Sequence, residues 1–154
     1  MTNVHTARRE DRSAILDIAA ESGLFAPEEL PDFMAAFDDW SPDGAEEARV
    51  WLIVPGGAGA ALLAPEPMSD NVWNMLFVGV REDDRRRGVG RALLRAVEDR
   101  ARDDGGRLLL IDTSGDEAQS GARVFYGAMG YAEEAVIRDY YGEGIDRVTF
   151  RRRL

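Results

Sequence analysis

The sequence predicts one α/β domain over residues 1–154, built as a mixed sheet with helices on both faces. Three observations favour this class. Apolar runs of strand length alternate with segments of helical periodicity, and no repeat or low-complexity linker divides the chain. A chain of 154 residues is also long enough to bury about two-thirds of its surface in a single core. The expected order of elements is β-α-α-β-β-β-α-β-α-β-β.

The first half of the chain predicts two helices between a short strand and a hairpin. Residues 5–8 (HTAR) form the strand, and apolar residues at helical spacing over 13–22 form the first helix, which Gly23 ends. Pro27 opens the second helix, because proline is well tolerated at the first helical position. The runs VWLIV and AGAALLA flank a Pro-Gly-Gly turn and predict the two hairpin strands.

The second half predicts the rest of the sheet around a strongly amphipathic helix. Residues 71–80 (NVWNMLFVGV) are apolar on both faces and are therefore expected at the centre of the sheet. From Val89 onward, apolar residues recur at the spacing of one helix face. The remaining elements are a buried strand at 107–112, a short helix at 122–129, and closing strands at 135–141 and 146–154.

Composition excludes several classes of function. The chain has no cysteine, which removes disulfides, thiolate metal sites and an acyl-cysteine intermediate. Its single histidine, His5, cannot build a multi-histidine site, so no metal is expected. The formal net charge of −10 argues against nucleic acid as a partner, since phosphate backbones need a positive surface. The polar N-terminus and the shortness of every apolar run predict a cytoplasmic protein that does not bind a membrane.

Residues 85–91 (RRRGVGR) predict an anion-binding loop. They lie between a strand that ends at Val80 and a helix, whose first amides lack partners and carry a partial positive charge. Gly88 and Gly90 would let an anion approach the backbone, and the arginines would add charge-assisted hydrogen bonds. A loop of solvated arginines is the alternative. Two nucleotide motifs do not fit: a Rossmann fingerprint needs glycine where Leu93 stands, and a P-loop needs a lysine, which the chain lacks.

The run from Arg85 to Gly90 resembles the Arg/Gln-x-x-Gly-x-Gly/Ala signature of the GCN5-related N-acetyltransferases, the GNAT family. LFVGV, just before it, resembles the splayed fourth strand of that family, and the expected element order matches its fold over essentially the whole chain. The resemblance implies acetyl-CoA as cosubstrate, with its pyrophosphate on the amides of residues 86–91 and its pantetheine arm along the fourth strand. The cofactor-binding residues implied in this way are Val78, Val80, Arg85, Arg86, Arg87, Gly88, Val89, Gly90, Arg91 and Gln119, the last in the register of a cofactor-contacting asparagine.

A second stretch, ARVFYGAMGY, resembles the family motif Ala-x-x-x-Tyr-x-x-x-Gly-Phe/Tyr, with Ala122, Tyr126, Gly130 and Tyr131 in register. By that resemblance Tyr126 lies near the thioester sulfur and acts as general acid. A phenol suits this role because it can protonate or hydrogen-bond a departing thiolate. The alternative is that Tyr126 is an ordinary core aromatic.

The acceptor side is implied by IRDYY, which resembles the corresponding strand of the branch that acetylates protein N-termini, including ribosomal-protein alanine acetyltransferases. Tyr140 and Tyr141 would then flank the acceptor, unless they only cover a strand end. Some family members carry a fourth-strand glutamate where this chain has Asn74, which can orient a substrate or water but is no useful base. The fifth-strand glutamate of the N-terminal branch corresponds to Asp112, which would act as base through a water or would merely cap a turn.

The sequence therefore predicts an N-acetyltransferase that moves an acetyl group from acetyl-CoA to a primary amine by direct attack in a ternary complex. The acceptor would be a peptide or a small-molecule amine. The sequence leaves open whether the protein forms a homodimer. Two alternatives stand beside this prediction. One is an acetyltransferase of small amines or amino acids rather than of protein N-termini. The other is an acyl-CoA-binding regulator without turnover, which Asn74 favours and Tyr126 disfavours.

Overall fold

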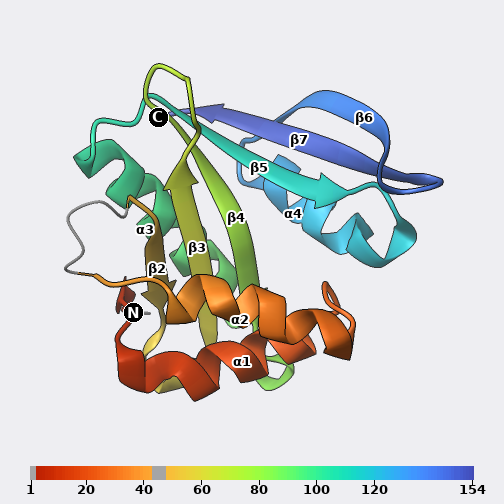
Figure 1. Ribbon diagram of the computed structural model, residues 1–154. Coiled ribbons are helices and arrows are strands. Elements are labelled where there is room, and N and C mark those ends of the chain that lie inside the picture. The colour runs from red at the N-terminus through yellow and green to blue at the C-terminus, as the bar shows by residue number, and fades with distance from the viewer. Residues whose placement is uncertain (1–2, 43–47) are drawn as a thin grey trace.

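The computed structural model describes residues 3–42 and 48–154, and its elements follow the expected order (Figure 1). The strands are β1 (His5–Thr6), β2 (Val50–Ile53), β3 (Gly59–Pro65), β4 (Val72–Val80), β5 (Leu108–Ser114), β6 (Ala132–Gly142) and β7 (Ile145–Arg153). The helices are α1 (Arg12–Glu21), α2 (Leu30–Asp38), α3 (Val89–Asp103) and α4 (Ser120–Ala128). The predicted mixed α/β fold is confirmed, and each predicted strand and helix is present.

The strands form one mixed sheet in the order β1-β2-β3-β4-β5-β7-β6. Neighbours pair antiparallel except β4 and β5, which run parallel at the centre. The central place of β4 follows from its sequence, since a strand that is apolar on both faces must be covered on both.

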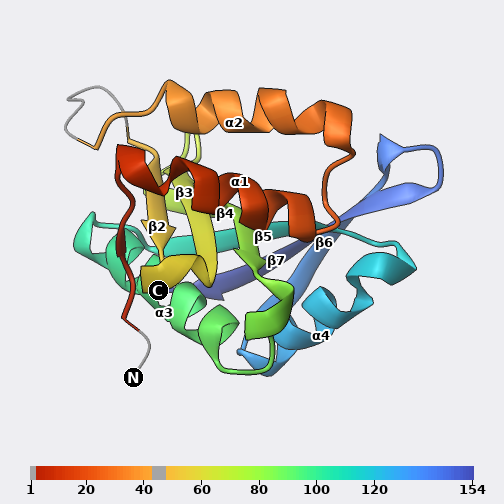
Figure 2. The same ribbon diagram turned by 90° about the horizontal axis from the view of Figure 1, so that it is seen from below.

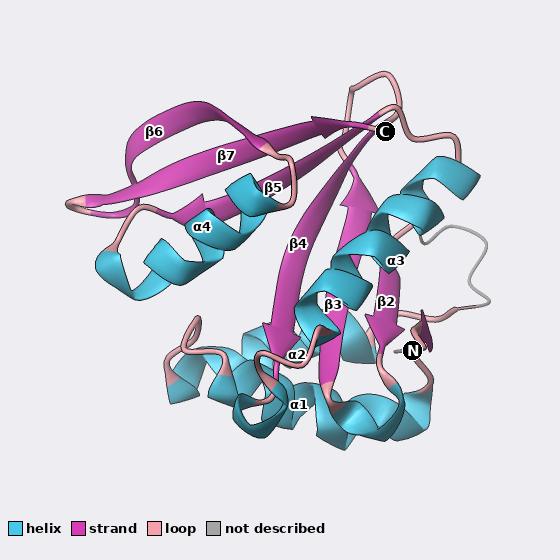
Figure 3. Cartoon of the chain, turned by 180° about the vertical axis from the view of Figure 1, so that it is seen from behind, coloured by secondary structure: helices cyan, strands magenta, loops and turns pink. Residues whose placement is uncertain are grey.

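Helices α1 and α2 lie on one face of the sheet, and α3 and α4 lie on the other (Figures 2 and 3). Two apolar clusters result, because each helix turns one apolar face to the sheet. On the α3 side, Leu93, Leu94 and Val97 are fully buried, and their helix contacts β2, β3 and β4. On the other side, Phe37 of α2 packs edge-to-face on Trp51 of β2.

The face that carries α1 and α2 is covered only in part. These helices lie over β2, β3 and β4, while β5, β7 and β6 extend beyond them (Figure 1). Burial along β5 alternates accordingly: Leu109 and Ile111 are buried on the α3 side, whereas Leu110 and Asp112 on the opposite side are only half-buried. We refer to this part of the sheet as the uncovered face.

Pairing between β4 and β5 stops halfway along both strands. Val72–Met75 pair with Leu108–Ile111, and beyond that point β4 and β5 diverge (Figure 1). We call this divergence, between residues 76–80 of β4 and 112–114 of β5, the fork. A bulge marks its apex, because Leu62 pairs with Phe77 and Leu63 with Met75, which leaves Leu76 without a partner on β3.

In the part of the chain that the structure describes, no helix is long and apolar enough to span a membrane.

A buried carboxylate ties α3 to β7 behind the fork. Glu98 is 4% exposed and accepts hydrogen bonds from the Tyr131 hydroxyl at 2.7 Å and from Arg152 Nη1 at 3.2 Å. Burial, together with this bond to Glu98, holds the pKa of Tyr131 far above its usual range. A buried carboxylate is tolerated here because Oε1 accepts two hydrogen bonds and Oε2 lies 3.9 Å from Arg102 Nη2.

Replacing Glu98 by Gln should lower the free energy of unfolding by about 1–3 kcal/mol, because the charge that faces Arg152 and the Tyr131 hydroxyl is lost inside the core. Urea denaturation measures this value. Asp99→Asn is the matched control: Asp99 is the next residue, its side chain is 73% exposed, and the change should stay within about 0.5 kcal/mol. Equal effects of the two variants would contradict a structural role for Glu98.

Candidate active site

The loop before α3 presents free backbone amides at a helix start. Gly88 caps the helix with φ of 80°, a left-handed conformation that favours glycine. Ala92 is the first residue of the helix whose amide bonds back to the loop, donating to the Gly88 carbonyl at 3.0 Å. Among the described residues, the amides of residues 86–91 bond to no other backbone group. Unpartnered amides at a helix N-terminus form a site for an anion.

Gly90 faces a space that a side chain could enter. A Cβ built there would lie 3.7 Å from Phe125 Cζ and 3.9 Å from Val80 Cγ2, which are ordinary contact distances. Nothing within the described protein therefore requires a glycine at this position. A group that approaches the backbone from outside would require one.

The free edge of β4 turns toward the fork. Arg81 N donates to Ala58 O at 2.8 Å, so its amide points toward β3. Because successive residues of a strand point their polar groups to opposite sides, the amides and carbonyls of Val80 and Val78 point away from β3. An extended ligand arm could pair with them as an additional strand does.

Tyr126 lies beside the fork on α4, which is on the same face of the sheet as α3, and β4 runs between these two helices (Figure 3). Its ring is 5% exposed and packs against Phe150 and Phe125, with centroids 5.6 and 5.7 Å away. Burial raises the pKa of Tyr126 to about 12, so the phenol keeps its proton at neutral pH. Among the described residues its hydroxyl forms no hydrogen bond. The residue is therefore packed in the core, as the alternative prediction had it, and its role as general acid stays a prediction.

Asp112 lies at the apex of the fork on the uncovered face. Its Oδ1 accepts a hydrogen bond from Thr149 Oγ1 at 2.6 Å and lies 3.0 Å from Arg147 Nε. The second contact is an ion pair rather than an aligned hydrogen bond, because the buried Nε–H has no acceptor in line. Oδ2 accepts from Asn74 Nδ2 at 3.0 Å, so two residues singled out in the sequence meet here. The carboxylate does not cap a turn.

The two tyrosines of β6 are joined to this group through Arg147. The guanidinium lies 4.8 Å from the centre of the Tyr140 ring, which in turn meets the Tyr141 ring edge-on at 5.0 Å. Burial and the charge of Asp112 raise the pKa of Tyr141. Both rings stay about half exposed, at 54% and 47%. Apolar surface is thus available next to the apex of the fork.

Residues 13–131 match the acetyltransferase (GNAT) family. The chain belongs to the GNAT family. A GNAT-family protein from Desulfovibrio desulfuricans superposes with a TM-score of 0.91 at 27% identity, over 99% of both chains. The ribosomal-protein-S18-alanine N-acetyltransferase of Escherichia coli gives 0.74 at 20% identity, over 99% of this chain and 94% of that one. No curated protein matches.

Two further solved structures of similar fold contain coenzyme A or acetyl-CoA. An aminoglycoside 6′-N-acetyltransferase complexed with coenzyme A superposes with a TM-score of 0.75 at 12% identity, over 98% and 96% of the two chains. A Salmonella typhimurium protein with acetyl-CoA gives 0.74 at 18% identity, over all of this chain and 94% of that one. The GNAT enzyme described here is an N-acetyltransferase with acetyl-CoA as donor, and the described residues contain no cluster suited to a metal.

The arginines of residues 85–91 divide into two groups. Arg85 holds the loop in place, since its Nη2 donates to the Glu21 carbonyl at 3.1 Å and its Nε to the Val80 carbonyl at 3.4 Å. Arg87 lies 4.0 Å from Asp84, and the Arg86 and Arg91 side chains are exposed. Three arginines thus remain at the rim for anionic groups. Gln119, half-buried, immediately precedes α4.

Glu21, which the sequence analysis did not single out, fastens the end of α1 to this loop. Its Oε1 lies 2.9 Å from Arg81 Nη2, and its Oε2 accepts from the Glu82 amide at 3.0 Å. These bonds to Arg81 and Glu82 lower the pKa of Glu21. The interaction is therefore intact at neutral pH and is lost only when the pH falls below the ordinary glutamate value of 4.5. Contacts across 61 residues leave no periodic signal in a sequence.

Glu21→Gln should weaken acetyl-CoA binding about twofold to tenfold, because the loop loses the charge that anchors it. Calorimetry at neutral pH measures the affinity. Asp17→Asn is the matched control, since Asp17 lies one turn earlier and faces the same Arg81 at 3.7 Å with a 60% exposed side chain. Asp17→Asn should bind acetyl-CoA as the wild type does. An unchanged affinity in Glu21→Gln would show that the loop needs no anchor on α1.

Proposed function

We propose that this enzyme transfers the acetyl group of acetyl-CoA to a primary amine by direct attack in a ternary complex. The observation that carries the proposal is the fork: it opens beside a glycine-capped helix start, with Tyr126 on one face of the sheet and Asp112 on the other. Donor and acceptor can then reach the same point from opposite faces. With no cysteine in the chain, no acyl-cysteine intermediate is available.

In this proposal the donor occupies the α3 and α4 side of the fork. The pyrophosphate accepts hydrogen bonds from the amides of residues 86–91, and the exposed arginines of the loop neutralise its charge. The pantetheine arm pairs with the free edge of β4 at Val78 and Val80. Gln119 contacts the cofactor from the start of α4, and Gly90 leaves room for its passage.

The reaction then needs one proton acceptor and one proton donor. Asp112 receives a proton from the ammonium group of the acceptor through a water, which its 18% exposed side chain can reach. The freed nitrogen lone pair forms the C–N bond to the thioester carbon, and the tetrahedral intermediate collapses with cleavage of the C–S bond. Tyr126 gives its proton to the sulfur, and one of the two protons left on nitrogen replaces it through solvent, while the other stays as the amide N–H. Overall the ammonium loses two protons, one to coenzyme A and one to solvent.

For the acceptor we propose a peptide or small-molecule amine that lies on the uncovered face against Tyr140 and Tyr141, with Asn74 orienting it. The IRDYY strand and the fold shared with the ribosomal-protein-S18-alanine N-acetyltransferase support an N-terminal amine. The fold shared with an aminoglycoside acetyltransferase supports a small-molecule amine as the second candidate. A panel of peptides and small amines, with release of coenzyme A thiol as readout, separates the two.

Tyr126→Phe removes one oxygen while the ring keeps its packing. If the phenol protonates the departing thiolate, kcat should fall about 10²–10⁴-fold, the usual worth of general acid catalysis, while acetyl-CoA affinity changes little. Single-turnover acetyl transfer to an accepted amine measures the chemical step. Because the pKa of Tyr126 is about 12, the wild-type rate should show no loss from phenol ionisation up to pH 9.

Tyr131→Phe is the matched control, because it removes the same atom from a buried tyrosine that bonds Glu98 instead of facing the fork. It should lower stability by about 1 kcal/mol and leave the single-turnover rate intact. A wild-type rate in Tyr126→Phe would assign the residue to the core alone. Failure of the wild type to release thiol with every amine tested would favour the regulator over the enzyme.

A further inference from the structure

Glu66 lies on the uncovered face, immediately beyond β3. Ala64 of β3 pairs with Asn74 of β4, and strand alternation places Glu66 on the same face, two residues further along. Its Oε1 accepts a hydrogen bond from Asn74 Nδ2 at 2.6 Å. Asn74 is the second-last residue of β4 that pairs with β5 before the fork opens. Glu66 therefore contacts a side chain that lies beside the proposed reaction site.

The amide of Asn74 is held between two carboxylates. Its Nδ2 donates to Glu66 and to Asp112, which uses both amide protons. Its Oδ1 is buried without a hydrogen-bond partner in a residue that is 3% exposed. Turning the amide over would put this oxygen against two anions, so the carboxylates fix its orientation. An unsatisfied buried acceptor destabilises a fold, and its presence here points to a ligand that supplies donors.

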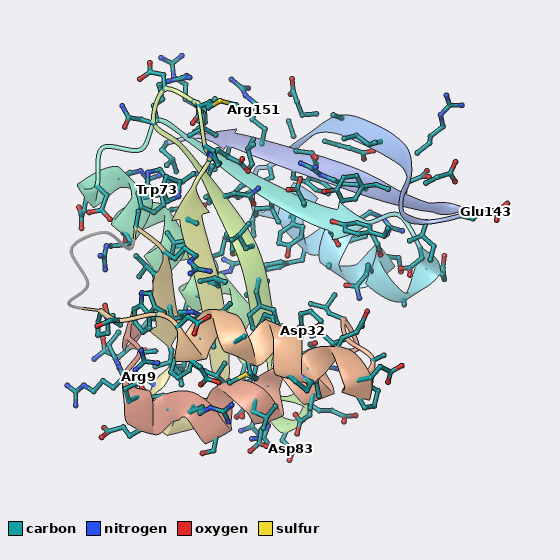
Figure 4. All side chains as sticks on the ribbon, viewed as in Figure 1. Arg9, Asp32, Trp73, Asp83, Glu143 and Arg151 are labelled. Atoms are coloured by element: carbon teal, nitrogen blue, oxygen red, sulfur yellow. The ribbon has the colours of Figure 1, made fainter. Side chains whose placement is uncertain are left out.

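The two carboxylates differ in their counter-charges. Asp112 faces Arg147, whereas in the described part of the chain no cation lies within ion-pair distance of Glu66. Of the other charged groups nearby, Asp70 on the loop after β3 lies 3.5 Å from Arg107. Arg151 lies on β7, separated from Asn74 by β5, toward the end of the strand opposite Glu143 (Figure 4). The charge left without a partner beside Asn74 is therefore that of Glu66, which is negative.

We propose that Glu66, Asn74 and Asp112 seat the acceptor amine in its protonated form, and that Glu66 selects for its positive charge. The inference rests on the acetyl transfer proposed above and deepens it. An ammonium group brings three N–H donors, which match the free oxygen of Glu66, the water through which Asp112 receives the proton and, once neighbouring side chains give way, Oδ1 of Asn74. Glu66 acts as a positioning residue, through its charge and through the hydrogen bond that it accepts from Asn74. Asp112 takes the proton.

This arrangement defines a substrate class. Primary alkyl amines and peptide α-amines are largely protonated near neutral pH, so they carry the charge that Glu66 favours. Arylamines are neutral there and offer fewer donors. The enzyme should therefore prefer an alkyl ammonium acceptor to an arylamine of similar size, and Glu66 should account for the preference.

The test is Glu66→Gln, which keeps the side-chain length and an oxygen for Asn74 but removes the charge. With benzylamine as acceptor, KM should rise about tenfold to a hundredfold, the factor expected for a lost hydrogen bond to a charged group, while kcat changes little. Benzylamine binding to the coenzyme A complex, measured by calorimetry, should weaken by the same factor. Binding of the neutral arylamine p-anisidine should not change, and Glu66→Asp should restore part of the benzylamine affinity.

Asp70→Asn is the matched control, since it removes one negative charge from the same loop at an 81% exposed side chain. Wild-type benzylamine affinity in Glu66→Gln, or an equal loss in Asp70→Asn, would overturn the inference. So would a wild-type complex that binds p-anisidine as tightly as benzylamine. Acetyl-CoA binding and thiol release by the wild type are measured first, so that failure of the acetyl transfer itself is recognised separately.

Discussion

The site depends on the place where β4 and β5 stop pairing. Their parallel ladder covers Val72–Met75 and Leu108–Ile111 and then ends at the bulge around Leu76. Beyond it, no strand of the described residues pairs with the outward backbone groups of Val78 and Val80, of which the Val80 carbonyl accepts only from Arg85 Nε, although buried backbone polar groups are normally paired. Helices α3 and α4 flank this stretch of β4 (Figure 3), so the unpaired edge has both a defined shape and an unmet demand for hydrogen bonds.

The fork also arranges charge in a protein that would repel its cosubstrate at long range. The formal net charge is −10, yet the loop beside the fork is cationic and its amides add the positive end of α3. Within a Debye length of about 8 Å this local field outweighs the distant acids. On the uncovered face, no cation of the described residues lies within ion-pair distance of Glu66. The face of the fork that carries α3 and α4 therefore suits a polyanion, and the uncovered face suits an ammonium group.

Much of the fold could be predicted because it follows from local periodicity. The helical spacing from Val89 and the two-sided apolar run of β4 each determined an element without knowledge of its neighbours. The site was predictable only where a local motif carries it, as for Gly88, Tyr126 and Asp112. Their catalytic and binding roles stay predictions.

What the sequence could not indicate lies in contacts between distant segments. Glu66 contacts Asn74 across a loop. Thr149 and Arg147 of β7 contact Asp112 of β5, and Glu21 at the end of α1 contacts Arg81 just after β4. Each of these is an ordinary polar residue in its own segment. The same applies to Arg85, whose contact with the α1 carbonyl separates it from the arginines at the rim.

The most direct test of the account is amide hydrogen exchange with and without acetyl-CoA. Along β4 the amides alternate, so Val78 and Val80 face the fork while Gly79 faces β3 and serves as internal control. Acetyl-CoA should slow exchange at the amides of Val78, Val80 and residues 86–91 and leave the exchange of the Gly79 amide unchanged. Unchanged exchange at Val78 and Val80, with protection elsewhere in the sheet, would contradict the fork as the acetyl-CoA site.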